Sequence, residues 1–194
     1  MLATMLGTAT DAIEARFTLR TGRPLQDALG DASYADAYRV EGDIVSFGLF
    51  VRWNADPLPV VLTSIRPIGA VGSPRIFGTG VGGPSVGFVD GFPPPRVTLV
   101  PVHGFVVEPG QGPSDGVQIV VGLRTSAGFS GILAFALDYS VAGQRYWAIL
   151  LQGASTCGEA YRRTCRSGER ELGLRQRALT TTFAPFVEGP DRSD

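Results

Sequence analysis

The sequence contains no lysine, one histidine and one asparagine. All 17 basic residues are therefore arginine, 18 residues are acidic, and the formal net charge is −1. A nearly neutral chain has no overall positive field that would attract nucleic acid or an anionic membrane surface. The composition therefore predicts no nucleic-acid partner, and other partners must be argued from local features.

The shortage of histidine and lysine also limits catalysis, because proton transfer near neutral pH mostly uses His, or a carboxylate or Lys with a shifted pKa. His103 lies in an alternating β-rich run on the same face as Phe105 and Val107, which predicts a buried or half-buried structural histidine. Asp138 alternates with Tyr139 in a strand pattern, and we expect solvent around its carboxylate. We predict no catalytic residue and no enzyme.

Two short motifs have the spacing of known signatures without their context. Residues 78–83 match G-x-G-x-x-G, but no helix follows to hold a phosphate, so we interpret them as a flexible loop. Residues 128–132 resemble a nucleophile elbow, but the second glycine falls one place early, so Ser130 is interpreted as a turn residue. No cofactor is predicted.

Metal ligands are scarce too. The single His and the two Cys, which lie far from it in the sequence, supply at best three ligands for zinc. Four acidic residues gather before the first clear strand, without EF-hand spacing, and favour a solvated segment over a calcium loop. They are Asp31, Asp36, Glu41 and Asp43. No metal site is predicted, and weak calcium binding at this segment stays open.

Long apolar runs are missing as well, since no stretch reaches the roughly 18 to 20 apolar residues of a membrane span. The best candidate, residues 131–153, is interrupted by Asp138, Gln144 and Arg145, so no transmembrane segment is predicted. The first ten residues lack the basic start and the apolar run of a secretory signal, although residues 3–9 are small and apolar enough for its remnant.

Glycine and proline, by contrast, are abundant, with 26 and 14 residues, which disfavours long helices and favours short strands joined by turns. Alternating apolar residues predict strands at 44–53, 117–123 and 133–141. Residues 145–152 are apolar on both faces, which is typical of a central or covered strand. We predict that 133–141 pairs antiparallel with 145–151 across the turn at residues 142–143.

The remaining regions have weaker patterns. A second hairpin is predicted between 44–53 and 60–66. Residues 67–95 are rich in Gly and Pro and predict a surface loop with a short strand at 75–77. The other expected elements are helical patches at 24–29 and 32–38, an alternating piece at 15–20, edge strands within 96–107, a loose tail at 188–194, and a β-like piece at 179–186.

About seven to nine short strands with Gly and Pro between them predict an all-β fold, an immunoglobulin-like antiparallel β-sandwich with N- and C-terminal extensions. The expected organisation is an N-terminal extension at 1–43, the sandwich at 44–153, and a disulfide-bearing C-terminal segment and tail at 154–194.

Cys157 and Cys165 lie close together among polar and charged residues, where an isolated thiol would be exposed and oxidisable. We predict that they form one disulfide, which would restrain an otherwise poorly packed segment. The alternative is a pair of reduced thiols in a cytosolic protein. A disulfide favours an extracytoplasmic or cell-envelope location.

The one basic stretch follows the first cysteine and is partly offset by glutamates. Its residues with a possible partner contact are Arg162, Arg163, Arg166 and Arg170, and Arg175 and Arg177 continue the stretch. Nucleic-acid binding would need interleaved aromatic side chains, and only Tyr161 is present. The stretch is either a plain charged surface or a docking patch for an acidic partner.

The succession of residues 61–69, 107–110, 117–124 and 139–146 resembles a recurring pattern in uncharacterised actinobacterial extracytoplasmic immunoglobulin-like proteins. The resemblance covers residues 44–152, consists of strand and turn residues, and carries over no functional residue. In those proteins such a domain often follows a membrane anchor, which is not expected in this sequence. The resemblance implies a β-sandwich outside the cytoplasm, in a possible membrane-associated complex.

These observations favour a non-enzymatic β-sandwich that acts through protein-protein contacts, as an accessory or structural subunit of a cell-envelope or larger assembly. The alternative is a carbohydrate- or small-ligand-binding module that uses Tyr146, Trp147 or Phe92, and solvent exposure of those rings would discriminate it. A hydrolase ranks third.

Overall fold

The computed structural model describes residues 20–21, 25–27, 33–49, 52–54, 57–83 and 86–183. Its elements, in chain order, are β1 (Arg20–Thr21), β2 (Leu25–Asp27), β3 (Ser33–Arg39), β4 (Ile44–Gly48), β5 (Arg52–Asn54), β6 (Val60–Val71), β7 (Arg75–Gly82), β8 (Phe88–Asp90), β9 (Val106–Val107), η1 (Pro113–Asp115), β10 (Gln118–Arg124), β11 (Phe129–Val141), β12 (Gln144–Leu150), β13 (Gln152–Gly158), η2 (Glu159–Tyr161) and α2 (Arg162–Phe183). Strands dominate, as the composition predicted.

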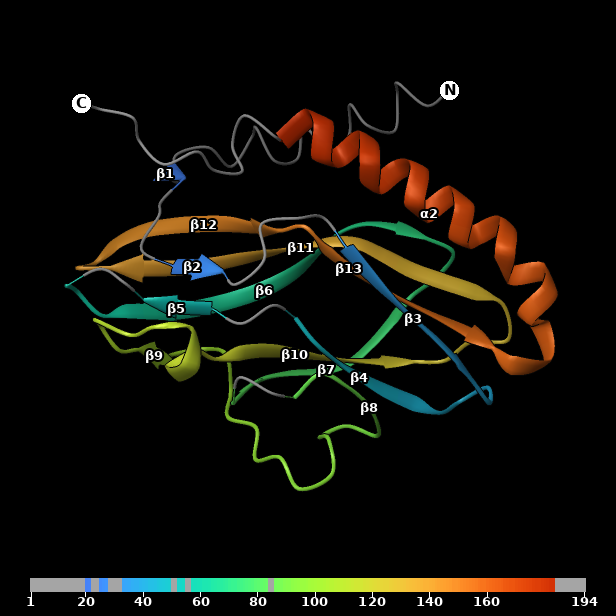
Figure 1. Cartoon of the computed structure of the whole chain (residues 1–194), viewed down its shortest axis with the longest axis horizontal. Coiled ribbons are helices and arrows are strands. Elements are labelled where there is room, and N and C mark those ends of the chain that lie inside the picture. The colour runs from blue at the N-terminus through green and yellow to red at the C-terminus, as the bar shows by residue number, and fades with distance from the viewer. Residues whose placement is uncertain are drawn as a thin grey trace.

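Two sheets pack face to face (Figure 1). The large sheet centres on β11, which pairs with β6 along one edge and with β12 and then β13 along the other; β1, β3 and β9 join it. The small sheet has the order β7-β10-β4-β8, and β2 and β5 form a separate pair. The predicted immunoglobulin-like antiparallel β-sandwich is confirmed, although β1 and β3 join the large sheet in parallel.

The main core lies between the two sheets. Period-two alternation sends every second side chain of β4 and β10 toward the large sheet, which supplies the opposite wall from β6 and β11. Phe47, Val121, Leu62 and Phe135 belong to this buried cluster. The apolar alternation of the sequence therefore specifies the inner faces of the sandwich.

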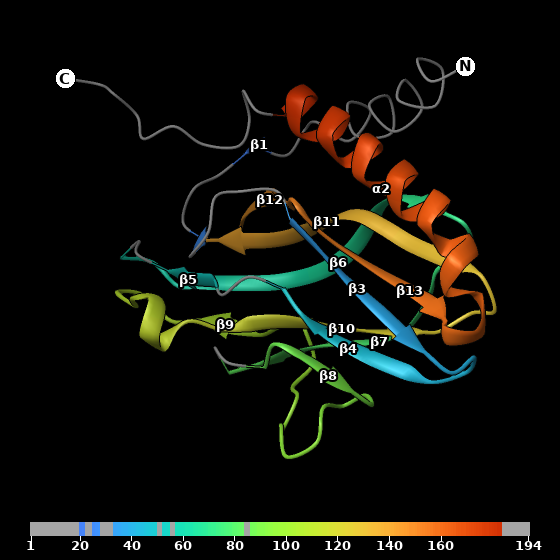
Figure 2. The same ribbon diagram turned by 45° about the vertical axis from the view of Figure 1, so that its right-hand side comes forward.

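A second core lies on the outer face of the large sheet, where α2 packs across β11, β13 and β6 (Figures 1 and 2). Leu133 and Ala136 of β11 contribute from the sheet, and Leu172 and Leu179 contribute from the helix. The large sheet is thus apolar on both faces because both are covered, as the sequence of β12 predicted.

The outer face of the small sheet is covered by the chain that follows β8. The ring of Phe92 lies over Gly78 and Gly122, where an added Cβ would come within 2.4 and 2.6 Å of ring atoms. Leu99 packs over Gly80 and Gly82 in the same way. Residues 78–83 are therefore mostly strand β7, and the interpretation as a flexible loop is wrong; the glycines leave room for this cover.

Pairing agrees with one of the two predicted hairpins. β11 and β12 pair antiparallel, from Phe135 opposite Leu150 to Val141 opposite Gln144. This confirms the hairpin predicted across residues 142–143. The second is wrong, because β4 pairs with β10 and β8 in the small sheet while β6 pairs with β11 and β9 in the large sheet. Alternation shows which face of a strand is buried and says nothing of its partner.

The predicted loop at 67–95 also needs correction. β6 continues through Pro67 to Val71, and β7 and β8 follow, so most of 67–95 is sheet. Pro67 is tolerated because the other edge of this part of β6 has no partner strand among the described residues. Residues 96–107 supply only β9 and an isolated bridge between Val100 and Val81.

The ends of the chain contribute more regular structure than expected. Residues 25–27 and 33–39 are strands where the sequence favoured helical patches, because β3 gains a full ladder with β13. β3 and β13 extend the large sheet beyond residues 44–153 on both sides. Residues 15–19, 24, 28–32, 184–186 and 188–194, with the predictions made for them, lie outside the described residues.

Residues 162–183 form one helix, so the β-like piece predicted from residue 179 is wrong within the described residues. Its buried stripe, Cys165, Leu172, Gln176 and Leu179, has helical spacing, but Gly168 and a run of threonines obscure the period. Packing on the sheet outweighs this poor local propensity. The part of the chain that the structure describes holds no helix with the length and apolarity to cross a membrane.

Candidate functional site

The start of α2 is attached to the large sheet by a disulfide between Cys157, near the end of strand β13, and Cys165. The bond is the one predicted, and its Cα atoms are 6.3 Å apart. The two side chains are only 2% and 1% exposed, so the bond lies in a packed part of the fold and not in the poorly packed segment that we expected. The cross-link holds the helix against the sheet at the point where the chain reverses.

Two further contacts fix which side of α2 faces inward. Gly168 lies against the ring of Phe129, where an added Cβ would come within 2.3 Å of the ring. The amide of Gln176 donates to the carbonyl oxygens of Leu133 and Leu151, at 3.2 and 3.3 Å. Leu151 lies between β12 and β13, so it belongs to neither strand. Gln176 provides a hydrogen-bond donor for its buried carbonyl oxygen.

The side of α2 opposite this buried stripe carries a row of arginines. At 100° per residue, Arg163, Arg166, Arg170, Leu174 and Arg177 fall on one outward stripe, and we call these five residues the arginine face. Leu174 is 64% exposed. The four arginines are exposed too. Sequence reasoning placed all four arginines in the basic stretch, named the first three as possible partner contacts, and missed Leu174.

The glutamates of α2 do not neutralise this face. Glu169 accepts a hydrogen bond from the Tyr38 hydroxyl on β3, and Glu171 pairs with Arg175 at 2.5 Å. No carboxylate of the described residues lies within ion-pair distance of the four arginines, although Arg170 also donates to the Arg166 carbonyl at 3.3 Å. Within the described residues, therefore, no ion pair offsets the charge of these four arginines.

Arg162 lies away from the face. Its guanidinium is 4.6 Å from the ring centroid of Tyr38, a cation-π contact that attaches the helix start to β3. The hydrogen bond to Glu169 is the main cause that raises the pKa of Tyr38 to about 12, with burial and nearby carboxylates adding to it. Of the four predicted contact residues, Arg162 is thus engaged within the protein.

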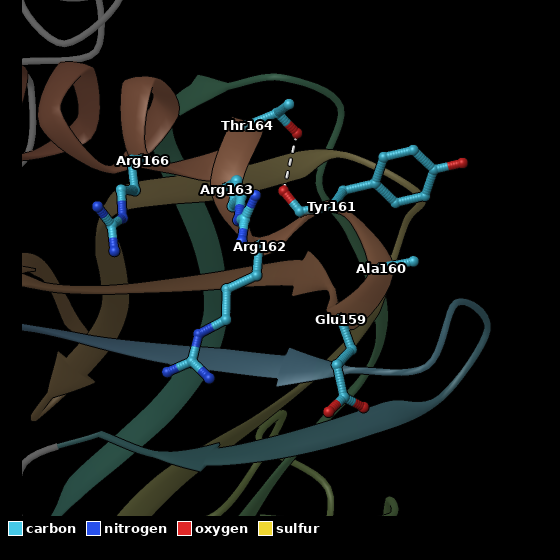
Figure 3. Close-up of a pocket in the computed structure, with 7 residues that line it drawn as sticks. All are labelled: Glu159, Ala160, Tyr161, Arg162, Arg163, Thr164 and Arg166. Atoms are coloured by element: carbon cyan, nitrogen blue, oxygen red, sulfur yellow. Dashed lines mark hydrogen bonds between the residues drawn. The ribbon is translucent and has the colours of Figure 1, made fainter.

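An open hollow of about 650 Å³ lies beside the first turn of α2. It is lined by Glu159, Ala160, Tyr161, Arg162, Arg163, Thr164 and Arg166. Figure 3 shows the three guanidinium groups on the opposite side from the Tyr161 ring, while the Thr164 hydroxyl donates to the Tyr161 carbonyl at 2.8 Å. The hollow continues the positive surface of the arginine face around the helix start.

The acidic segment does not gather into a cluster. Asp31 lies outside the described residues, and Glu41 and Asp43 are exposed around the turn between β3 and β4. Asp36 accepts a hydrogen bond from Ser155. Neighbouring atoms displace water from its carboxylate and raise its pKa, the Ser155 bond opposes this, and the charge of Glu169 adds to it. The described residues contain no group of three potential metal ligands.

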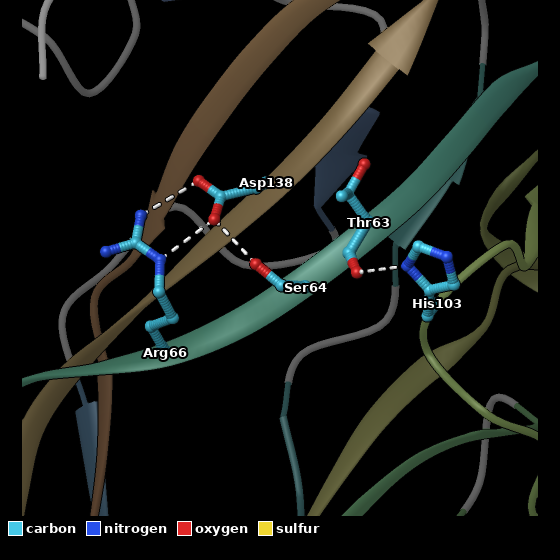
Figure 4. Close-up of polar contacts among 5 residues, drawn as sticks. All are labelled: Thr63, Ser64, Arg66, His103 and Asp138. Carbon is cyan, nitrogen blue, oxygen red and sulfur yellow. Dashed lines mark hydrogen bonds and ion pairs between the residues drawn. The ribbon is translucent and has the colours of Figure 1, made fainter.

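His103 and Asp138, the two candidates for proton transfer, lie at opposite edges of β6 (Figure 4). His103 is exposed, with Nδ1 3.1 Å from the Thr63 carbonyl oxygen, so the prediction of a buried histidine is wrong. The preceding chain is a loop at the sheet edge, where strand alternation does not apply.

Asp138 is not solvated as expected, since its side chain is 19% exposed and makes polar contacts with Ser64 and Arg66. Ser64 donates to it at 2.6 Å, and Arg66 donates two hydrogen bonds at 2.8 and 2.9 Å. Ser130, predicted in a turn, is buried in β11 and lies 3.2 Å from the Thr156 hydroxyl. These groups do not converge on one site.

The three aromatic rings considered for ligand binding are occupied within the fold. Trp147 is 8% exposed. Tyr146 is stacked on Tyr139 with ring centroids 5.7 Å apart, and Phe92 packs on Gly78. Trp147 is buried and the other two rings are half-buried, so none of the three is a fully exposed ring of the kind that would favour a carbohydrate-binding module.

No family model matches the chain, and no curated protein matches it. Two solved structures are similar over part of its length. A Vibrio cholerae protease, VesB, shares 15% identity with a TM-score of 0.33 over 70% of this chain, which spans 32% of the protease. The ASH/PapD-like domain of human CEP192 (PapD-like domain 7) shares 11% identity with a TM-score of 0.35 over 72% of this chain and 89% of that domain.

Proposed function

We propose that this chain is a non-enzymatic β-sandwich that acts through protein-protein contacts, and that the arginine face of α2 is its contact surface. The observation that carries the proposal is the row of four exposed arginines without carboxylate partners among the described residues. Arginine is enriched in the energetically important parts of protein interfaces because its planar guanidinium makes several directed hydrogen bonds.

The rigidity of the helix supports this role. The disulfide, Leu172 and Gln176 hold α2 in one orientation, so the arginines are presented without further ordering of the backbone. A preorganised surface loses less conformational entropy when it binds. This favours a subunit that docks over a chain that folds on its partner.

The wider role that we propose is that of an accessory or structural subunit in an extracytoplasmic or cell-envelope assembly. The resemblance to extracytoplasmic actinobacterial proteins supports the location. The buried disulfide supports an oxidising compartment, because cytosolic proteins rarely keep such bonds. The separation of His103 from Asp138 supports the proposal that the chain is not a hydrolase.

Affinity capture from the cell envelope of the native source tests the proposed contact surface. The bait is the full chain, compared with a variant that carries Arg163→Glu, Arg166→Glu and Arg170→Glu. A matched control carries Arg75→Glu, Arg96→Glu and Arg145→Glu, three exposed arginines elsewhere that change the net charge equally. We expect the wild-type chain and the control to retain one partner and the face variant to lose it. Equal retention by all three baits would refute the proposal.

A further inference from the structure

We infer that the partner of the arginine face is an acidic amphipathic helix that lies antiparallel along α2. This inference rests on the proposed function, because it names the partner of the same surface. It follows from the spacing of the arginines, the exposure of Leu174 and the direction of the helix.

The spacing favours a helical partner. Arg163 and Arg177 are fourteen residue steps apart on one helix, or about 21 Å at 1.5 Å per residue. A second helix repeats its side chains with the same period, so one stripe of carboxylates meets all four guanidinium groups. Side chains on one face of an extended strand recur about every 6.8 Å, which does not match the one-turn steps between Arg163, Arg166 and Arg170.

Leu174 gives the surface an apolar centre. Its side chain is 64% exposed and lies between Arg170 and Arg177 on the same stripe. An exposed leucine surrounded by charges gains from contact with one apolar side chain of the partner. The fitting stripe is therefore acidic with one apolar residue opposite Leu174.

The antiparallel direction follows from the distribution of charge. Three of the four arginines lie in the first half of α2, next to the positive end of its macrodipole. An antiparallel partner places its negative C-terminal end at these arginines. Helix dipoles and side-chain charges then favour the same arrangement.

Two other anionic partners fit less well. Single-stranded nucleic acid binds on aromatic stacking platforms, and the five residues of the face include no aromatic side chain. An anionic membrane needs a broad apolar face beside the basic residues, and Leu174 is the one apolar member of this face. The face is positively charged but lacks both aromatic stacking platforms and a broad apolar surface. An acidic protein segment therefore fits it better than nucleic acid or a membrane.

A designed peptide tests the inference directly. The probe is a fluorescein-labelled helical peptide that carries Glu opposite each of the four arginines and Leu opposite Leu174, in antiparallel alignment. Fluorescence anisotropy with the full chain is expected to show saturable binding that weakens about tenfold or more from low to high salt, because the charges lie in solvent. A peptide with Gln in place of Glu is expected not to bind.

The variants make the test specific. Arg163→Glu with Arg166→Glu and Arg170→Glu should weaken binding of the acidic peptide at least tenfold, whereas Arg75→Glu with Arg96→Glu and Arg145→Glu should change it less than threefold. Leu174→Ala should weaken it severalfold without changing its salt dependence, because that side chain is uncharged.

Three outcomes would overturn the inference: absence of saturable peptide binding, equal loss in both triple variants, or tighter binding of oligothymidine or phosphatidylserine vesicles than of the peptide. If the peptide fails while the face variant still loses the captured partner, the proposed contact surface stands and only the acidic helix is wrong. If the face variant loses nothing in either experiment, both proposals fail.

Discussion

Each sheet of the sandwich has a cover on its outer face, and the two covers are built differently. α2 covers the large sheet as one regular helix that is cross-linked by a disulfide. Residues 91–100 cover the small sheet as irregular chain that contains three consecutive prolines. Both covers lie on glycines: Gly131 lies under Leu172, and Gly78 and Gly122 lie under Phe92.

The difference between the covers lies in what they present to solvent. A helix that buries one stripe necessarily presents an opposite stripe at regular spacing, which here is the arginine face. The irregular cover uses Phe92, Val97 and Leu99 to fill space over glycines, and its outward side chains follow no period. A regular cover therefore presents a regularly spaced outer surface as a consequence of its packing.

The largest expected effect is at the buried anchor of the helical cover. Leu172→Ala removes a fully buried side chain from the second core and should lower the free energy of unfolding by about 2–5 kcal/mol in chemical denaturation. Leu174→Ala, two residues along the same helix, is the matched control and should cost less than about 0.5 kcal/mol. Similar losses in both variants would contradict the assignment of inward and outward faces.

The disulfide should contribute slightly less. Cys157→Ala with Cys165→Ala opens a short covalent loop and should cost about 2–3 kcal/mol by the chain-entropy relation. Circular dichroism should still show the helix, because Leu172 and Leu179 keep their contacts. Loss of the helical signal would mean that the cross-link and not the packing holds this cover.

The irregular cover depends on the absence of a side chain beneath it. Gly122→Ala places a methyl group against the Phe92 ring and should cost about 1–3 kcal/mol in thermal or chemical denaturation. In a Phe92→Ala background the same change should cost much less, since the clash is gone. Gly128→Ala, where nothing lies within 4 Å, is the control and should be nearly neutral. Additive effects at positions 92 and 122 would disprove the contact.

The smallest effect concerns pH at the contact between α2 and β3. The raised pKa of Asp36 means that the folded chain holds this proton more tightly than the unfolded chain, so its stabilising contribution is present below pH 3.8 and is lost as pH rises through the raised pKa. Asp36→Asn keeps an acceptor for Ser155. As pH rises, the free energy of unfolding of this variant should increase relative to wild type by a few tenths of a kcal/mol, a small effect because solvent screens the exposed carboxylate. Denaturation curves whose difference stays constant with pH would contradict this.

Much of the sandwich was predictable because alternation reflects burial directly. β10, β11 and β12 lie where their apolar period placed them, and the β11–β12 hairpin followed from the short turn between them. Pairings between distant segments were not predictable, since a period carries no information about the neighbouring strand. β3 is the clearest example. Its sequence has little intrinsic preference for a strand, and the hydrogen-bonded ladder with β13 stabilises the strand instead.

The sequence analysis identified the arginines of the candidate site as a charge run, but it did not recognise their helical spacing. Arg163, Arg166 and Arg170 were identified as a charge run, although their spacing with Leu174 and Arg177 is already that of a helix stripe. Gly168, Gly173 and the threonines argued against a helix on propensity. The position of His103 could not be inferred, because the turn before β9 interrupts the alternation.

The parallel ladder between β3 and β13 also affects how the chain reaches its fold. Ser33 pairs with Gln152 and Arg39 pairs with Gly158, so this edge of the large sheet joins segments from opposite ends of the described chain. During synthesis β3 emerges early and has no partner strand until residues 152–158 have followed it. Long-range closure of this kind is slow compared with hairpin formation, and the β3–β13 edge of the sheet can form only after residues 152–158 have been synthesised.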